Sequence, residues 1–442
     1  MRRFLIPVSV IVASILFSSF YFLNKNQSST FKTDDTYCRQ ENVSDRAKCL
    51  FNIDKIEKLE LTSKKPLDLT YHKSNKDIEV SLAGTSLPTA KLKTRGNTTY
   101  QAGTLYGAYN YKLTFEEPVN LYNFGTNKKW VLLPNFIDRS YFRQFYTSNL
   151  AELVMGDFWS PEMKYVELYI NNEYKGLYLL SESIEEDENR LNNPEFIVQL
   201  EQGRLWRLEQ GSDKPFFQID DKSLSCNITG KNTEPTNTMY TLEYPDTLTD
   251  NIKAEVNQLV NSAREKKPLS ELNLNLDSAV NFYLFDELFF NSGFGSSSVY
   301  LYKPQNGKII LGPLWDFDQL LLLSRNYGYN RPPTCDNNLY RYLLKYPEFR
   351  DKLKEKLIWF RDTIEPLALK HLESLRNNQN LRTAILKNEN LYHTWQNPLD
   401  NLAVWQNEEI IRLKDWDEHL NFIRDALKGR ADWLIENFEG LV

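Results

Sequence analysis

The sequence predicts an α+β protein in which strands prevail up to about residue 325 and helices beyond it. In residues 53–93, apolar and polar residues alternate in short runs separated by turn-forming segments, a pattern typical of antiparallel strands. In residues 346–375 and 407–438, apolar residues recur at helical spacing opposite charged faces. At 442 residues, the chain is long enough for more than one lobe around a substantial core.

Residues 297–320, SSVYLYKPQNGKIILGPLWDFDQL, contain the strongest hairpin signal in the chain, an Asn-Gly pair between two alternating apolar runs. The second run leads into Asp316 and Asp318. Because side chains alternate along a strand, both carboxylates should project to one face, roughly 7 Å apart, while Trp315 and Phe317 anchor the other face in a core. Two such carboxylates can hold Mg²⁺ together with water and phosphate oxygens. The alternative is a solvated strand end that carries two acids.

The composition is that of an ordinary globular protein, with 41% hydrophobic and 25% charged residues. The formal net charge is -6 and no long basic run is present, so nucleic acid is not an expected partner. Aromatic residues make up 13% of the chain. That content suits either a strand-rich protein or a carbohydrate-contacting surface.

The N-terminal segment predicts a membrane anchor. Residues 4–23 carry no charge, and as a helix they would extend about 30 Å, enough to span a bilayer. Arg2 and Arg3 before the span outweigh Lys25 after it, which favours a cytoplasmic N-terminus and an exported body. A cleaved signal peptide is the alternative, and the body would then be secreted. The length of the apolar region and the lack of a clear A-x-A site favour an uncleaved anchor in residues 1–25.

Residues 26–52 are expected to form a tether and a small helical cap pinned by cysteines. An even number of cysteines in an exported chain permits two disulfides, and the favoured pairing closes the short loop 38–49 and leaves 226 with 335. Four unpaired thiols are the alternative. Neither the cysteines nor the histidines show metal-binding spacing. These residues are Cys38, Cys49, Cys226, Cys335, His72, His371, His393 and His419.

Two cations in the strand-rich part are candidate anion ligands. Arg95 lies in the turn TRGNTT, whose glycine lets the backbone approach an anion closely, although an ordinary turn has the same composition. Lys112 lies on the polar face of the alternating strand 109–115. It is either a solvated lysine or, if that face lines a cleft, a phosphate-pairing one.

Two further charged residues lie where predicted elements begin or end. Arg143 falls in the first turn of a predicted helix, 141–154, where it could bind phosphate or form a structural ion pair. Glu182 follows a predicted hairpin, 165–180, with Asn-Asn at its turn. This glutamate could pair with a cleft lysine or simply be exposed.

The middle of the chain predicts strands in residues 195–221, a loop in 222–238 and a helix in 249–266. A second, strongly apolar helix is expected in residues 279–291, with Asp277 as its N-cap. It leads into the hairpin described above.

These features, in this order, resemble the CotH kinase family, the spore-coat CotH-like atypical kinases. The resemblance covers roughly residues 59–321, is weaker in the helical tail, and rests on eight motifs. They are RGNTT at 95–99, the strand of Lys112, KKWVLL at 128–133, SYFR at 140–143, the hairpin LYINNEYKGLYLLSESIE, YPD at 244–246, the helix ending at Asn291, and GPLWDFD at 312–318.

The resemblance implies a protein-kinase-like bilobal fold, with a strand-rich N-terminal lobe and a helical C-terminal lobe. The core would span residues 53–325 and a helical extension residues 326–442. It further implies binding of ATP with Mg²⁺ and phosphorylation of Ser or Thr in a protein substrate.

Individual roles also follow from the resemblance. Lys112 looks like the phosphate-pairing lysine, and Asp316 like the metal-binding aspartate, with Asp318 beside it. Arg95, Arg143 and Glu182 match recurrent polar positions of the family. Phosphoryl transfer requires positioned cations and metal ligands more than covalent chemistry, which agrees with this set.

One departure from the family pattern opens an alternative. Members often read Asn-x-Asp after the helix that precedes the hairpin, whereas this chain has Gly293 at the Asp position. Either Asp286, Glu287 or Asp318 substitutes, or phosphoryl transfer is lost. The second case gives a pseudokinase that serves as an envelope scaffold or binding module, and an exported domain would also meet little ATP. A third reading has Asp316 and Asp318 act as a carboxylate pair on glycans.

Overall fold

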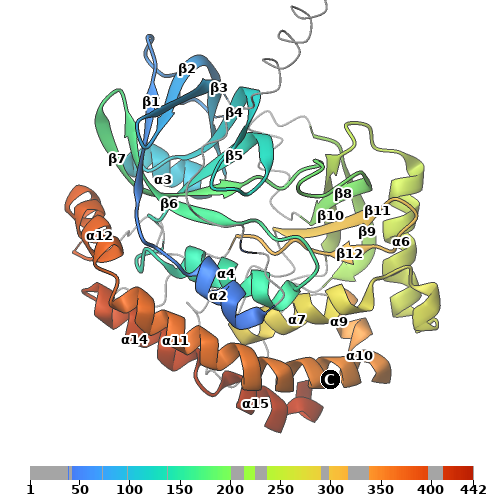
Figure 1. Ribbon diagram of the computed structural model, residues 1–442. Coiled ribbons are helices and arrows are strands. Elements are labelled where there is room, and N and C mark those ends of the chain that lie inside the picture. The colour runs from blue at the N-terminus through green and yellow to red at the C-terminus, as the bar shows by residue number, and fades with distance from the viewer. Residues whose placement is uncertain are drawn as a thin grey trace, which may run out of the picture.

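The structure is a computed structural model (Figure 1) that describes residues 38, 42–71, 73–96, 98–136, 138–200, 214–223, 236–289, 298–316, 338–396 and 412–441. Within these ranges no helix is long and apolar enough to cross a membrane. The predicted anchor, residues 4–23, lies outside them, as do Asp318, Gly293, Cys226 and Cys335.

Seven strands of the N-terminal part form a closed barrel in the order β1-β2-β3-β4-β5-β7-β6. The expected antiparallel strands are present, and a parallel pairing of β1 with β6 closes the barrel, with Leu59 opposite Leu168. Alternate residues such as Leu113, Trp130 and Tyr178 fill its core. The strands are β1 (Glu57–Thr62), β2 (Ser74–Leu82), β3 (Thr85–Arg95), β4 (Asn110–Asn120), β5 (Thr126–Pro134), β6 (Met163–Ile170) and β7 (Glu173–Glu182).

The β6–β7 hairpin confirms the prediction made from its sequence. Asn171 and Asn172 have φ angles of 51° and 65°, the left-handed backbone that a tight two-residue hairpin turn requires. Asparagine tolerates this conformation better than most residues. The turn therefore sets the register of the two strands.

Five further strands form a second sheet in the order β12-β11-β8-β10-β9. The predicted Asn-Gly hairpin is confirmed, because β11 pairs with β12 through Leu301 opposite Leu311. Strand β10 begins inside the segment expected to be a loop, residues 222–238, so that boundary was wrong. The strands are β8 (Pro194–Leu200), β9 (Phe216–Ser223), β10 (Thr236–Tyr244), β11 (Val299–Pro304) and β12 (Ile310–Leu311).

A small apolar cluster joins the barrel to the second sheet. Its members are buried and come from β5, from β8, β11 and β12, and from the segments that connect them. Val131 is the barrel's contribution, because it is the residue of β5 that points outward between the inward Trp130 and Leu132. We call this set the interlayer cluster; it consists of Val131, Trp159, Leu191, Ile197, Tyr300, Tyr302, Ile310 and Trp315.

Helices pack beneath both sheets, as Figure 1 shows for the α10–α11 arm along the bottom of the view. The central pair is α4 (Arg143–Met155), which is buried along its whole length, and α7 (Leu276–Phe289), which is almost so. The predicted helices in residues 141–154, 249–266, 279–291 and the tail are present. Helix α7 begins at Leu276, so Asp277 lies in its first turn and is not its N-cap as predicted. The others are α2 (Val43–Leu50), α3 (Thr98–Tyr106), α6 (Asp250–Arg264), η1 (Leu269–Glu271), α9 (Asn338–Leu343), α10 (Pro347–Trp359), η2 (Phe360–Ile364), α11 (Glu365–Arg376), α12 (Gln379–Tyr392), α14 (Trp416–Leu427), α15 (Arg430–Glu436) and η4 (Phe438–Leu441).

The predicted disulfide and a short helix beside it are confirmed. Cys38 and Cys49 form a disulfide that attaches the chain to α2. Arg46 on α2 pairs with Glu152 on α4, and the Asn149 amide donates to the Leu50 carbonyl oxygen at 3.0 Å. The mixed α+β class predicted from the sequence is therefore correct, with a strand-rich N-terminal region and a helical C-terminal part.

Helix α12 attaches the helical tail to the segment before α4 through one buried carboxylate and to the barrel through the adjacent asparagine. Glu389 accepts hydrogen bonds from the Tyr141 hydroxyl at 2.5 Å, the Thr394 hydroxyl at 2.8 Å and the Trp395 amide at 2.8 Å. The neighbouring Asn388 accepts a hydrogen bond at 2.7 Å from the backbone amide of Leu177 in β7. Residues more than two hundred positions apart are thus fastened together.

We expect Glu389→Ala to lower the free energy of unfolding by about 2–4 kcal/mol, because it leaves several buried donors without an acceptor. Denaturant titration measures the change. The matched control is Glu373→Ala on α11, whose side chain is 48% exposed and pairs with Arg376 in an i,i+3 geometry. That substitution should change the free energy by less than about 0.5 kcal/mol. Equal effects of the two substitutions would contradict the role given to Glu389.

His419 on α14 should make the fold sensitive to acid. It is fully buried, and neither ring nitrogen has a hydrogen-bond partner among the described residues. Burial, and then the charges of Arg143 and Arg139, hold its pKa well below the usual 6.5. At this histidine the unfolded chain binds a proton that the folded protein excludes. The contribution of His419 to the free energy of unfolding is therefore complete above pH 6.5 and is lost as the pH falls below that value.

We therefore expect stability to fall by up to about 1.4 kcal/mol per pH unit below that pH for this histidine, and His419→Leu to flatten the slope. Denaturant titrations between about pH 5 and 8 test this. His393→Asn, at an exposed position, is the control and should leave the slope unchanged. A His419→Leu slope as steep as the parent's would refute the assignment.

Candidate functional site

Lys112 lies on the outer face of the barrel, where the barrel meets the second sheet. Its neighbours Tyr111 and Leu113 point into the barrel core, so Lys112 points outward. It is paired across the sheet with Val131 of the interlayer cluster on one side and with Lys93 on the other. This position places its ammonium group beside the packing surface of the two sheets.

The surroundings of Lys112 are rich in cations. Burial lowers its pKa to about 8, Glu185 opposes this shift, and Lys129, Lys93 and Arg95 add to it. Like charges that face each other across adjacent strands destabilise a sheet. A bound anion would therefore stabilise the charged form of Lys112.

Glu185 is the principal acid of this region and was not selected from the sequence. Its carboxylate contacts Lys129 Nζ at 2.5 Å through one oxygen and Arg190 Nη1 at 2.5 Å through the other. The sequence offers several acids in this stretch, and nothing in their spacing distinguishes Glu185. Glu185 takes this role because the loop after β7 brings Arg190 back towards that strand.

Glu182 has a different environment from the one expected. It is buried, so the exposed alternative was wrong. Its carboxylate accepts a hydrogen bond from the Glu162 amide at 3.0 Å and lies 3.4 Å from Arg190 Nε. Strand β7 continues as far as Glu182, which is paired with Trp130 and is thereby held inside the sheet. The partner seen here is an arginine rather than a cleft lysine.

Arg95 and Asp316 are brought close through Trp315. The Arg95 guanidinium lies 5.7 Å from the centre of the Trp315 ring, at the edge of the interlayer cluster. The turn after Arg95 needs its glycine, because Gly96 has a φ of +88° and an added Cβ would lie 1.9 Å from Thr99 Oγ1. Trp315 is buried, as the sequence predicted.

Asp316 is exposed and does not lie on a strand. Its backbone φ is 74°, and its carboxylate accepts a hydrogen bond from Ser298 Oγ at 2.7 Å. The prediction that the strand extends through Asp316 was wrong, because β12 ends at Leu311. Pro313 has no amide hydrogen to donate to a sheet ladder, which disfavours strand pairing at this point. Asp318 itself is outside the described residues.

The family model for CotH kinase protein matches residues 92–434. The chain belongs to the CotH kinase family. The match runs from β3 to α15 and so includes the helical tail, where the sequence resemblance was weaker. A comparison with curated proteins finds no match.

In this CotH chain, Arg143 has a structural role. Its side chain is fully buried and forms an ion pair of 2.5 Å with Asp138. Asp138 also accepts the Arg143 backbone amide at 2.6 Å, which satisfies a donor at the start of α4. Of the two alternatives, the structure shows the ion pair.

The two acids of α7 that could substitute for the carboxylate missing at Gly293 are both buried. Asp286 is fully buried, and Glu287 is 1% exposed and lies 3.5 Å from the Arg430 guanidinium. Burial lowers the pKa of Arg430 to about 10, although the charge of Glu287 opposes the shift. Both acids therefore lie in the helical core.

The residues present fit a nucleotide phosphate better than a complete metal site. Lys112, Lys129 and Arg95 supply positive charge along one edge of the interlayer cluster, and Asp316 supplies one exposed carboxylate. Mg²⁺ on a nucleotide commonly takes one or two protein carboxylates and completes its shell with water and phosphate. Across the described ranges, no three acids, histidines or cysteines are grouped to hold a metal without such help.

We expect Lys112→Met to raise the free energy of unfolding by about 1–3 kcal/mol at pH 7, because methionine removes a buried charge from a cation-rich site. The pKa of Lys112 is about 8 in the folded chain and 10.5 ordinarily. Between these two pH values the unfolded chain therefore binds more protons than the folded chain. The parent should gain stability as the pH rises through this window, and the advantage of the variant should shrink. Denaturant titrations at several pH values measure both effects.

Lys129→Met is the control for this substitution, because the Lys129 side chain is 46% exposed. It should leave stability unchanged or slightly reduced through loss of the Glu185 contact. A lower free energy of unfolding in Lys112→Met would contradict the prediction, because it would show that the ammonium group makes favourable contacts in the folded protein.

Proposed function

We propose that this CotH chain binds Mg-ATP between the barrel and the second sheet and transfers the γ-phosphoryl group to a Ser or Thr hydroxyl of a protein. The barrel and the helix-backed second sheet would then be the two lobes of a protein-kinase-like fold. The observation that carries the proposal is the position of Lys112, a half-buried lysine whose pKa is lowered to about 8 and which faces the layer that bears Asp316. Membrane anchorage through residues 4–23, with the body exported to the cell envelope, belongs to the same proposal.

Lys112 would pair with the phosphates, whose negative charge would offset both its burial and its cationic neighbours. Glu185 and Arg190 would hold the surrounding side chains in place. Arg95 lies at the same edge and would add charge stabilisation as the phosphoryl group moves.

Asp316, with Asp318, would hold the magnesium ion, which neutralises phosphate charge when it is bound. The acceptor hydroxyl forms the new O–P bond and loses its proton, while the bond from the γ-phosphorus to the β–γ bridging oxygen breaks and ADP leaves. Asp318 is the candidate to receive that proton.

A second function is favoured by one specific observation. Gly293 supplies no carboxylate, and Asp286 and Glu287 are both buried in the helical core. The chain would then be a pseudokinase that binds nucleotide or another partner without transfer, as an envelope scaffold. Binding is common to both functions, and transfer separates them.

We expect saturating Mg-ATP to stabilise the detergent-solubilised full chain by about 2.7 kcal/mol at 100 times its Kd, seen as a rise in melting temperature. Lys112→Met and Asp316→Ala should each abolish most of the rise. Lys370→Met, at an exposed position on α11, is the control and should keep it.

Radiolabel transfer from γ-labelled ATP to a mixed protein acceptor then distinguishes kinase from pseudokinase. No melting shift at millimolar Mg-ATP in a folded sample would refute nucleotide binding by either.

A further inference from the structure

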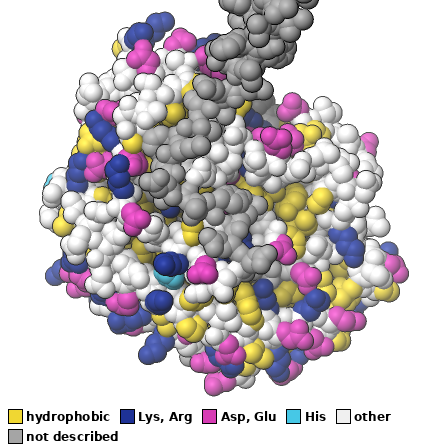
Figure 2. Space-filling view, viewed as in Figure 1, with side chains coloured by type: hydrophobic (Ala, Val, Ile, Leu, Met, Phe, Trp, Pro, Cys, Tyr) yellow, Lys and Arg dark blue, Asp and Glu magenta, His cyan; other side chains and the backbone are white. Residues whose placement is uncertain are grey.

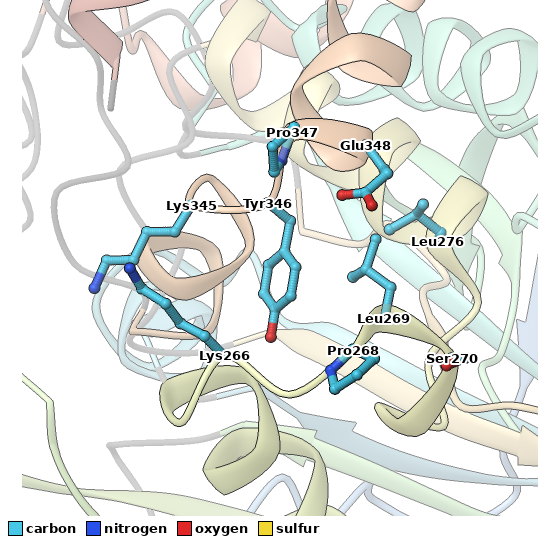
Figure 3. Close-up of a pocket in the computed structure, with 9 residues that line it drawn as sticks. All are labelled: Lys266, Pro268, Leu269, Ser270, Leu276, Lys345, Tyr346, Pro347 and Glu348. Atoms are coloured by element: carbon cyan, nitrogen blue, oxygen red, sulfur yellow. The ribbon is translucent and has the colours of Figure 1, made fainter.

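A groove of about 710 Å³ lies in the helical part of the molecule and shares no residue with the Lys112 region (Figure 3). One wall is the connection from α6 through η1 to the start of α7, and the other is the connection from α9 to α10. Its volume falls within the roughly 300–1,000 Å³ of sites that hold a drug-sized ligand, which is also the size of a few peptide side chains.

The floor and walls of the groove are apolar and preformed. Leu269 and Leu276 line one side, and the buried ring of Tyr346 lies across from them. The Tyr346 hydroxyl donates to the Lys267 carbonyl oxygen at 2.7 Å and so ties the two walls together. Pro268 and Pro347 stiffen the connections on either side. A ligand would therefore meet an ordered surface, which lowers the entropic cost of binding.

The charges of the groove are divided between its two ends. In Figure 3, Lys266 and Lys345 lie on one side of Tyr346, and Glu348 lies on the other. Both lysines are exposed, and neither has an acidic partner within the described part of the chain. The Lys345 ammonium lies 5.3 Å from the centre of the Tyr342 ring, which holds its stem against the surface.

The whole chain carries a net charge of -6. Figure 2 shows Lys and Arg interspersed with Asp and Glu over the face it views, with no continuous basic area there. Two lysines without acidic partners beside an apolar groove therefore form a local site for carboxylates that the protein as a whole would repel.

One wall of the groove is joined to the hairpin that leads to Asp316. The Ile309 amide donates to the Asn273 carbonyl oxygen at 2.9 Å, and the Asn275 amide donates to the Ile309 carbonyl oxygen at 2.7 Å. Ile309 directly precedes β12, from which the chain continues to Asp316. The wall that would contact an occupant is thus hydrogen-bonded to the element that leads to the candidate site.

We propose that this groove is a docking site for an acidic-apolar peptide segment of a partner protein. One or two carboxylates of the segment contact Lys266 and Lys345, and an adjacent apolar side chain enters between Leu269, Leu276 and Tyr346. Charge complementarity selects this occupant over a basic or purely apolar one. The proposal concerns binding alone and does not depend on phosphoryl transfer.

The test is selection of a displayed random heptapeptide library on the full-length protein, followed by affinity measurement of the enriched peptides. We expect a class in which Asp or Glu precedes an apolar residue. Its affinity should fall about tenfold in the Lys266→Glu/Lys345→Glu double variant, since two partly desolvated ion pairs together account for roughly that factor. Affinity should also fall as salt is raised, because these charges lie at the surface.

The control is Lys76→Glu/Lys370→Glu, which makes the same change in net charge at exposed positions on β2 and α11. It should retain the affinity of the parent, and Leu269→Asp should lose it through the apolar wall. Melting temperatures of all variants verify folding. Enrichment of no acidic-apolar class, or of one that binds the Lys266→Glu/Lys345→Glu variant as well as the parent, would overturn the proposal whatever the outcome of the Mg-ATP experiment.

Discussion

Apolar side chains from β5, β8, β11 and β12 pack together where the barrel meets the second sheet, and the candidate site depends on this contact. Val131 points out of the barrel, and Tyr300, Tyr302 and Trp315 meet it from the other layer. Because Lys112 is the cross-strand partner of Val131, the same packing that buries the valine desolvates the lysine. The Trp315 ring contacts the Arg95 guanidinium. Asp316 follows Trp315 and so lies at the edge of the cluster.

A small number of acids partly offset the positive charge around Lys112. Glu185 bridges Lys129 and Arg190, and Glu182 meets Arg190 from the end of β7. Burial, and to a lesser extent Lys129, Lys93 and Arg95, still lowers the pKa of Lys112, so holding its charge costs the fold some stability that a bound anion would restore. Such a trade of stability for binding is common at functional sites.

The helical tail secures this arrangement from a distance. Glu389 and Asn388 on α12 bind the barrel side, and Arg430 on α15 donates to the Glu287 carbonyl oxygen of α7 at 3.1 Å. These are buried polar contacts, for which loss of one partner is costly. The family match likewise extends through the tail to residue 434. The α9–α10 connection also supplies one wall of the lysine-bearing groove, so the tail contributes surface as well as support.

The sequence by itself determined the α+β class, both hairpins, the main helices, the Cys38–Cys49 disulfide and the family, because turn residues, helical periodicity and a short loop between cysteines are local signals. It also singled out Lys112 and Asp316. Only the tertiary structure decided that β1 closes a barrel on β6, that Glu185 rather than Glu182 lies beside the lysines, that Arg143 is a buried ion pair, and that the chain leaves the strand before Asp316. Each of these depends on contacts between distant segments, and no local pattern encodes which of several similar charged residues the fold will bring together.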